Sequence, residues 1–368
     1  MDQWIEQAKN QIIEKMRRNV GEIGADFPNV CREDRYGVGQ DTWWTNGFWP
    51  GMLWLAYRET DEEVFAKTAN QIEEMLDTPL HDYLGLHHDV GFMWLLSSVA
   101  QYRLNGNEAS RRRALIAASF LASRYNIKGK FIRAWNVGSQ DEPPIAGWAI
   151  IDCMMNIPIL FWASEQLNDP RYRHIACAHA DTVMKEFIQE DGSSHHIVCF
   201  DPESGKRICS LGGQGYSPTS AWSRGAGWAI YGMAMAYSYT GKERYLKTAK
   251  RVAKFFINSL PEDKVPYWDF RAPIHSKTPR DTSAAAIAAC GMLEMSKYTK
   301  TKVYQKAAED ILKSLYNNYS NWDTGYQGML THATGDNAKK IDVEVSLIYG
   351  DYYFMEGILR LLGKDRLF

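Results

Sequence analysis

Residues 231–256, YGMAMAYSYTGKERYLKTAKRVAKFF, carry the pattern that decides the fold. Small and aromatic residues recur at helical spacing on both sides of a short polar turn at Gly241, which predicts two helices joined as a hairpin. The same order of helix, polar turn and helix is found at residues 54–76, 99–122, 160–184 and 291–316. A sixth copy, at residues 352–363, stops before its second helix.

The N-terminal segment completes this repeat. Residues 2–18 show an amphipathic helical pattern and can pair with the unfinished sixth copy. Six hairpins closed in this way predict an all-α fold, an (α/α)6 barrel with one helix of each pair inside the ring and one outside. An open solenoid gives similar local patterns, but a terminal helix that completes the last pair favours closure. Residues 1–368 then form a single domain, and no Pro-, Ser- or Gly-rich linker marks a boundary.

Charge and cysteine content narrow the class of protein. The net charge of −2 gives no support to nucleic-acid binding, which requires a strongly basic face. No apolar run approaches the roughly 18 residues of a membrane span, and the charged N-terminus lacks the features of a secretory signal. The six Cys residues form no CxxC pair, so we expect reduced, mostly buried thiols in a cytoplasmic protein.

The aromatic residues gather in the long connections between hairpins. The chain has 13 Trp, and most of them lie in these connections rather than in the short turns. In a closed barrel the long connections emerge at one end, so we expect the indoles to converge around one mouth and to stack on a flat ligand there. One connection is also expected to contain a short β-hairpin, formed by residues 194–200 and 206–210.

Two aspartates stand in apolar surroundings. Asp89 precedes Val90 and Phe92, and Asp152 is the only charged residue in GWAIIDCMMNIPIL at 147–160. Desolvation disfavours an ionised carboxyl, so we expect a raised pKa at both and the ability to donate a proton near neutral pH. The competing interpretation is an N-cap at the start of a helix, where the helix field favours the anion.

Further polar residues offer contacts to an anionic ligand. Arg224 lies in WSRGAGW at 222–228, between two indoles and beside glycines that let a ligand approach the backbone; a tight structural turn is the alternative. The pairs His87-His88 and His195-His196 are expected to donate hydrogen bonds rather than to bind a metal, because adjacent side chains diverge. We expect neither a metal nor a cofactor.

Together these motifs resemble glycoside hydrolase family 88, the unsaturated glucuronyl hydrolases. The resemblance covers nearly the whole chain and rests on a series of motifs in order: DTWWTNGFWPGMLW at 41–54, HHDVGF at 87–92, GWAIIDCMMNIPIL at 147–160, SSHHIVCFDPESG at 193–205, GGQGYSPTSAWSRGAGWAIYG at 212–232, VPYWDF at 265–270, DTSAAAIAACGMLE at 281–294 and VSLIYGDYYFMEGILRL at 345–361. It implies an (α/α)6 barrel and an intracellular enzyme. The implied substrates are fragments left by polysaccharide lyases, whose terminal uronic acid carries a C4=C5 double bond that the enzyme hydrates.

The resemblance also implies roles for single residues. Asp152 matches the general acid/base that protonates C4 and activates water, and Asp89 matches a second carboxylate that holds sugar hydroxyls. The remaining matches are substrate-binding residues: the stacking indoles Trp43, Trp135 and Trp228, the polar contacts His196, Gln214 and Arg224, with Arg224 near the uronate carboxylate, and in addition Asn46, His88 and Trp268.

Substrate preference stays open at this point. Family members that prefer sulfated fragments carry a Ser-x-x-Ser-x-Lys stretch. Residues 330–336 correspond to it here, with Asp336 in place of the Lys, and this acidic side chain is expected to repel sulfate. Competing functions are an unsaturated rhamnogalacturonyl hydrolase acting on pectin fragments, a lyase or epimerase on the same barrel, and a sugar-binding protein without activity. The expected partner is a small oligosaccharide, and the expected assembly is a monomer or a homodimer.

Overall fold

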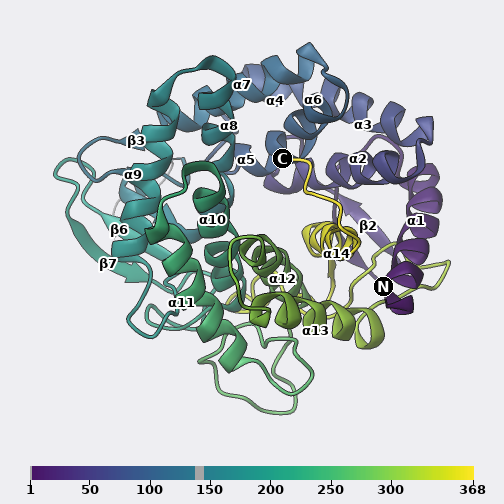
Figure 1. Ribbon diagram of the computed structural model, residues 1–368. Coiled ribbons are helices and arrows are strands. Elements are labelled where there is room, and N and C mark those ends of the chain that lie inside the picture. Colours follow the sequence, from purple (N-terminus) through teal and green to yellow (C-terminus); the bar gives the residue numbers. More distant parts are fainter. Residues whose placement is uncertain (1, 137–144) are drawn as a thin grey trace.

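The computed structural model describes residues 2–136 and 145–368, and its helices form a closed ring (Figure 1). Residues 137–144, part of one connection that the sequence assigns to the mouth, lie outside the described residues. Within the described part, five helical hairpins follow one another. The first pairs α2 (Phe48–Thr60) with α3 (Glu63–Met75), and the short α4 (Asp77–Asp82) follows it. In the second, the inner helix consists of α5 (Val90–Trp94), the π-helical segment η2 (Leu95–Val99) and α6 (Ala100–Asn105), and its partner is α7 (Glu108–Ser123). The other three hairpins are α8 (Pro158–Leu167) with α9 (Pro170–Glu186), α10 (Ser223–Thr240) with α11 (Glu243–Ser259), and α12 (Thr282–Ser296) with α13 (Val303–Asn318).

The sixth pair joins the two ends of the chain. Helix α14 (Ile348–Leu361) is its inner member, and α1 (Gln3–Ile23) lies outside it, next to α13 in Figure 1. The ammonium group of Lys15 in α1 donates to the backbone carbonyls of Asn321, Tyr326 and Gly328. These contacts close the ring, and the predicted (α/α)6 barrel is confirmed.

Inner and outer helices differ in their burial. In α14, 13 of the 14 residues are buried, so this helix is in contact with protein on all sides. Helix α11 buries one stripe, including Tyr245, Ala249, Val252 and Phe256, and exposes the opposite face. This 3.6-residue periodicity is the pattern that the sequence shows for an outer helix.

The short turns of the hairpins lie where the sequence places them. Four inner helices end at a residue with left-handed backbone, Asp61, Gly106, Asn168 and Gly241, with φ between 51° and 73°. This conformation ends a helix sharply and reverses the chain within a few residues. Because every hairpin turns at the same end of the ring, the long connections meet at the other end.

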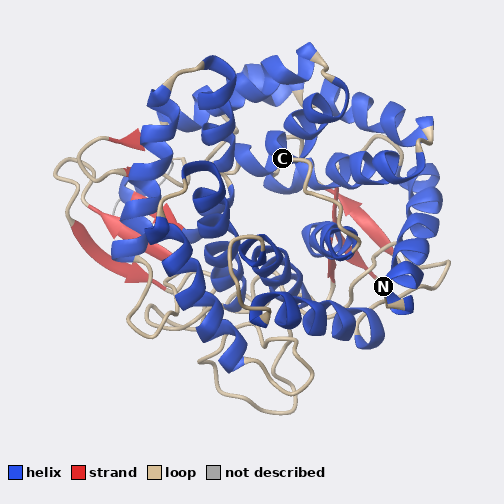
Figure 2. Ribbon diagram, viewed as in Figure 1, coloured by secondary structure: helices blue, strands red, loops and turns tan. Residues whose placement is uncertain are grey.

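Strands are small additions to this ring of helices (Figure 2). The sheet at the mouth has the antiparallel order β5 (Trp148–Ile150), β6 (Ile197–Phe200) and β7 (Arg207–Leu211), which confirms the predicted β-hairpin. The other strands are β1 (Pro28–Arg32), β2 (Arg35–Val38) and β8 (Ser346–Leu347) in one sheet, and β3 (Tyr125–Asn126) with β4 (Phe131–Ile132) in a hairpin.

All six Cys residues are free, and five of them are buried, as predicted. Among the described helices, none combines the length and the apolar character that a membrane crossing requires.

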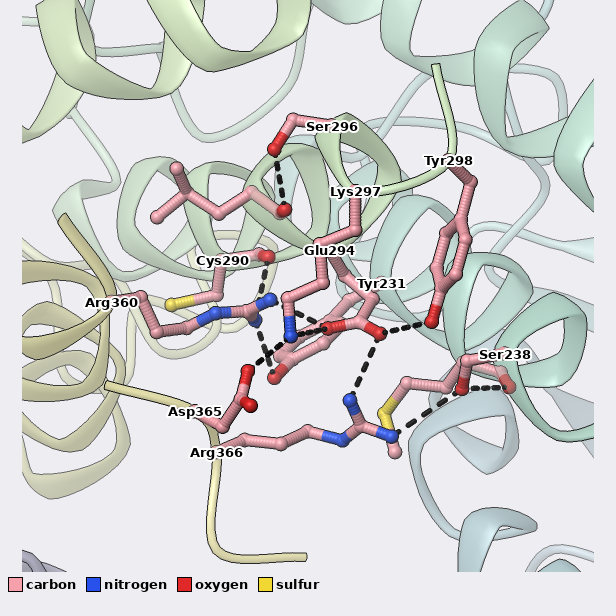
Figure 3. Close-up of polar contacts among 12 residues, drawn as sticks. Tyr231, Ser238, Cys290, Glu294, Ser296, Lys297, Tyr298, Arg360, Asp365 and Arg366 are labelled. Atoms are coloured by element: carbon pink, nitrogen blue, oxygen red, sulfur yellow. Dashed lines mark hydrogen bonds and ion pairs between the residues drawn. The ribbon is translucent and has the colours of Figure 1, made fainter. Parts of the chain in front are cut away.

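The end of the barrel opposite the mouth is closed by the C-terminal segment, which lies at the centre of the ring (Figure 1). Phe368 is buried and its ring lies 6.3 Å from that of Tyr231. Next to it, Arg360 and Arg366 each donate to the buried carboxylate of Glu294, and Arg360 also donates to the Tyr231 hydroxyl (Figure 3). We call Tyr231, Glu294, Arg360 and Arg366 the rear network.

Candidate functional site

A cavity of about 280 Å³ opens where the long connections meet. It brings together both aspartates that the sequence singles out and six of the nine predicted substrate-binding residues. The residues that line it are Trp43, Trp44, His87, His88, Asp89, Trp135, Ile150, Asp152, His196, Gln214 and Arg224.

Asp152 is held in a short 3₁₀ turn, η4 (Ile151–Met155), directly after β5. The pKa of its carboxyl is raised from 3.8 to about 7: burial is the largest cause, the negative charge of Asp89 adds to it, and Arg224 opposes both. The N-cap position of η4 belongs to Ile150, and no side chain caps this turn, so the capping interpretation is wrong for Asp152. A carboxyl with this pKa is about half protonated at neutral pH and can both give and take a proton.

Asp89 lies immediately before α5 and is the second buried carboxyl of the cavity. Its Oδ1 accepts the Asn156 amide at 2.9 Å, and its Oδ2 lies 3.2 Å from Nδ1 of His87. Burial alone raises the pKa of Asp89, but His88, His87 and the Asn156 amide together outweigh it and lower the pKa. The raised pKa that the sequence predicts for Asp89 is therefore wrong. Its side chain does not cap α5 either.

His196 faces Asp152, with 3.7 Å between Nε2 and the nearer carboxylate oxygen. Its Nδ1 lies 2.9 Å from the backbone N–H of Gln214 and 3.3 Å from the carbonyl oxygen of Gly212. The shorter contact, in which Nδ1 accepts, favours the neutral tautomer with its hydrogen on Nε2, on the side of Asp152. Burial lowers the pKa of His196 to about 3, which keeps the ring neutral. Gly213 has a φ of +57°, and a Cβ there would stand 2.1 Å from the imidazole, so only glycine fits this turn.

Arg224, the second residue of α10, forms the charged wall of the cavity. Its guanidinium donates to Asp281 at 2.7 Å, to the side-chain oxygen of Gln214 at 2.5 Å, and to the backbone carbonyls of Thr334 and Gly335. The alternative of a tight turn with structural indoles is wrong in its turn, because residues 223–240 are helical, but right in its indoles, since Trp222 and Trp228 are both buried. Arg224 thus fixes Gln214 and brings a positive charge close to Asp152.

The aromatic wall is smaller than the sequence predicts. Trp43, 43% exposed, and Trp135 line the cavity as expected. Trp228 is fully buried, with its ring 5.0 Å from that of Phe92, so the stacking role predicted for it is wrong. Most of the indoles near the mouth point into the core, because the inner helices begin within the same motifs.

Two other predicted residues lie outside this cavity. Asn46 is 1% exposed and its amide donates to the carbonyls of Gln40 and Asp41, so it braces its own loop. Trp268 is 5% exposed and lines a separate cavity of about 680 Å³ together with Tyr216. Direct substrate contact is therefore a wrong prediction for Asn46, and Trp268 does not belong to the Asp152 cavity.

The two neighbouring histidines converge instead of diverging. One ring nitrogen of each lies within 3.5 Å of the Asp89 carboxylate, and the ligand atoms of His87, His88 and Asp89 lie within 4.8 Å of one another. The expectation that the side chains of His87 and His88 diverge, which argued against a metal here, is therefore wrong. Within the described residues, this is the group of three whose spacing is compatible with a metal ion.

The repulsion of sulfate by Asp336 stays a prediction. The Asp336 carboxylate accepts the backbone N–H of Lys339 at 3.1 Å and lies 3.7 Å from the ammonium group of the same, largely exposed residue. Lys339 therefore places a positive charge beside Asp336.

Two lining residues, Trp44 and Ile150, and the supporting residue Asn156, which contacts Asp89 from behind, were not predicted from the sequence. His87, expected as a hydrogen-bond donor, lines the cavity. Trp44 adjoins the predicted Trp43 in the same motif, which is a usable signal. Asn156 is a lone amide in an apolar run, and its partner is 67 residues away, so no local pattern indicates it.

Comparisons with known proteins agree along the whole chain. The family model of Glycosyl Hydrolase Family 88 matches residues 4–360. The crystal structure of unsaturated glucuronyl hydrolase from Bacillus sp. GL1, described as responsible for the degradation of glycosaminoglycan, superposes with a TM-score of 0.93 at 37% identity, covering 97% of this chain and 96% of that one. The unsaturated chondroitin disaccharide hydrolase of Streptococcus pyogenes serotype M1 is 36% identical over 97% of this chain and 90% of its own length. A mutant enzyme from Streptococcus agalactiae, complexed with dGlcA-GalNAc6S, has a TM-score of 0.85 at 32% identity and covers 99% of this chain and 93% of that one.

Proposed function

The chain belongs to glycosyl hydrolase family 88 and is an unsaturated glucuronyl hydrolase, and we propose that it releases the unsaturated glucuronic acid from the non-reducing end of lyase-generated glycosaminoglycan fragments. The observation that carries this proposal is the pair of carboxyls in one cavity whose pKa values are moved apart. Asp152 is raised to about 7, and Asp89 is lowered. Such a pair provides an acid and a permanent anion side by side.

Asp152 carries the proton transfer. Its protonated carboxyl gives a proton to C4 of the C4=C5 double bond, and positive charge develops at C5, next to the ring oxygen. The resulting carboxylate then takes a proton from a water molecule whose oxygen adds to C5. The product is a hemiketal, which opens and expels the rest of the oligosaccharide. Because the double bond and not C1 is attacked, the separation of carboxylates that distinguishes retaining from inverting glycosidases does not apply.

The other cavity residues bind and orient the sugar. Asp89 is ionised and accepts hydrogen bonds from sugar hydroxyls, while the indoles of Trp43 and Trp135 offer faces for stacking. The neutral Nε2–H of His196 and the amide of Gln214 provide hydrogen bonds beside Asp152. The charge of Arg224 attracts the uronate carboxylate. A cavity of about 280 Å³ is at the lower limit for drug-sized ligands, and we assign to it the terminal sugar alone.

The test follows the ultraviolet absorbance of the double bond in a panel of lyase-derived disaccharides. An unsaturated chondroitin disaccharide should lose its absorbance in the presence of the protein, whereas a lyase would create absorbance and a binding protein would leave it unchanged. Faster consumption of an unsaturated galacturonyl-rhamnose would instead support the pectin-directed alternative. Sulfated and unsulfated forms of the same disaccharide would measure the sulfate preference directly.

Location and assembly are part of the same proposal. Six unpaired thiols are typical of a reducing compartment, which supports a cytoplasmic enzyme that acts on imported fragments. A monomer or a homodimer is the expected assembly, and light scattering would distinguish the two.

A further inference from the structure

Asn156 lies between the two aspartates, outside the set of residues that line the cavity. It is completely buried. Its Nδ2 donates to Oδ1 of Asp89 at 2.9 Å and lies 3.3 Å from the backbone carbonyl of Asp152. Its Oδ1 accepts the backbone N–H of Phe92 at 2.8 Å. One side chain thus connects η4, which carries Asp152, with the start of α5, which follows Asp89.

The backbone around this amide is packed without spare room. A Cβ on Gly91 would stand 2.4 Å from the Cα of Asn156 and 2.6 Å from its Oδ1. Real Cβ contacts are never this short, so the first turn of α5 can approach Asn156 only because residue 91 is glycine. The close approach fixes the distance between the two segments that present the carboxyls.

The amide also has an electrostatic effect. It lies among several titratable groups around Asp89: His87 and His88 on the same segment, Asp152 and Cys153 on η4, and Arg124 after α7. Burial lowers the pKa of His88 to about 4, so this ring is neutral at pH 7. A neutral donor at hydrogen-bond distance then stabilises the Asp89 anion. That anion in turn disfavours ionisation of Asp152.

We propose that Asn156 is a positioning residue that holds Asp89 ionised and fixes it relative to Asp152. The inference rests on the proposed function for its kinetic readout. The oxygen of Asn156 accepts from the backbone of Phe92, and its nitrogen donates to Asp89 and, at 3.3 Å, to the carbonyl of Asp152. The contact of the oxygen can be separated from those of the nitrogen by substitution.

Asn156→Asp separates them. The new side chain has the same shape and keeps an acceptor for the Phe92 N–H, but it replaces the donor to Asp89 by a second carboxyl. Two adjacent carboxyls cannot both ionise readily, so the pair retains a proton to higher pH. Asn156→Ala removes the donor without adding a charge. A hydrogen bond to a charged group corresponds to a pKa change of about one to two units.

Both variants should move the acid limb of the pH profile of kcat/KM upward by about one pH unit or more, and kcat should fall by about tenfold or more with a smaller change in KM. Near-UV circular dichroism restricts the comparison to pH values at which each variant is folded. The matched control is Asn19→Ala, since Asn19 is equally a buried amide but donates to the carbonyl of Gln327, far from the cavity. This control should lose stability and keep the wild-type pH profile.

Profiles of both Asn156 variants that overlay the wild type, with only a loss of stability like that of Asn19→Ala, would overturn the inference. A wild-type protein that consumes no unsaturated substrate would refute the proposed function instead. The ¹³C carboxyl resonance of Asp89, assigned with Asp89→Asn, reports its titration without turnover. If Asn156→Ala leaves that titration unchanged, the inference fails independently of activity.

Discussion

The two ends of the barrel each contain a buried carboxyl group near basic side chains, and the pKa values of the two carboxyls are shifted in opposite directions. At the closed end, both oxygens of Glu294 are engaged, by Arg366 at 2.9 Å and by Arg360 at 2.5 Å (Figure 3). Burial on its own raises the pKa of Glu294, but these cations outweigh it and lower the pKa. At the mouth, Oδ2 of Asp152 has no hydrogen-bond partner within the described residues, and its pKa is raised.

The difference shows that burial alone does not decide the charge of a carboxyl. Formal positive charge beside the carboxyl changes the outcome: Glu294 accepts from two guanidinium groups, whereas Asp351 accepts three hydrogen bonds from uncharged donors and keeps a raised pKa. The carboxyl with two guanidinium partners is a structural anion, and Asp152, which has no such partner at hydrogen-bond distance among the residues that the structure describes, keeps a proton that it can transfer. Changes at either end of the barrel should therefore affect different properties: turnover at the mouth and stability at the closed end.

The largest effect is expected for Asp152→Asn. The amide cannot transfer a proton to C4, so turnover should fall by about 10²–10⁴-fold, measured as loss of double-bond absorbance. At pH 8 the free energy of unfolding should stay equal or increase, because the variant removes a buried charge without partners. Wild-type turnover in this variant would refute the role of Asp152.

Glu294→Gln should produce the opposite result at the closed end. It removes the carboxylate partner of Arg366 and leaves Arg360 with the more distant carboxylate of Glu356 at 3.5 Å, which lowers the free energy of unfolding by about 3–5 kcal/mol in denaturant titrations. The kcat of the protein that remains folded should not change. A variant with normal stability would show that the rear network does not need its carboxylate.

The pH dependence of turnover tests the Asp152 carboxyl directly. Because the reactive form is protonated and the pKa is about 7, kcat/KM should fall roughly tenfold per pH unit well above pH 7. The free energy of unfolding should also fall as pH rises. The pKa of Asp152 is higher in the folded state, so folding favours the protonated carboxyl, and this contribution to stability is lost between pH 3.8 and about pH 7. A rate that is constant between pH 6 and about 9 would contradict the assignment.

The smallest effect is expected for Trp228→Phe. The indole of Trp228 lowers the pKa of Asp152, although burial dominates that pKa. Removing the N–H while keeping an aromatic ring should move the alkaline limb upward by about half a pH unit. Trp94→Phe is the matched control, because Trp94 is equally buried but is not among the groups that shift the pKa of Asp152. An equal shift of the alkaline limb in both variants would show that the Trp228 N–H does not influence the pKa of Asp152.

The sequence determines the ring more fully than the cavity. Helix periodicity and turn residues such as Gly241 are local signals, so hairpins and their order are visible along the chain. The direction of a side chain near a helix start is not local: Trp43 and Trp228 occur in similar motifs, yet one faces the cavity and the other the core. Likewise, His87 and His88 converge on Asp89 only through the backbone turn before α5, and the contact of Asn156 spans 67 residues.

The pairing of α1 with α14 has a consequence for synthesis. The ribosome releases α1 first, but the partners of Lys15 lie more than 300 residues later. At 5–20 residues per second, Lys15 stays without these partners for roughly 15 to 60 s. Helix α1 can pack on α2 and α3 early, but a nascent chain stalled before residue 320 cannot form the Lys15 contacts that close the ring. Ring closure therefore belongs to the last part of synthesis.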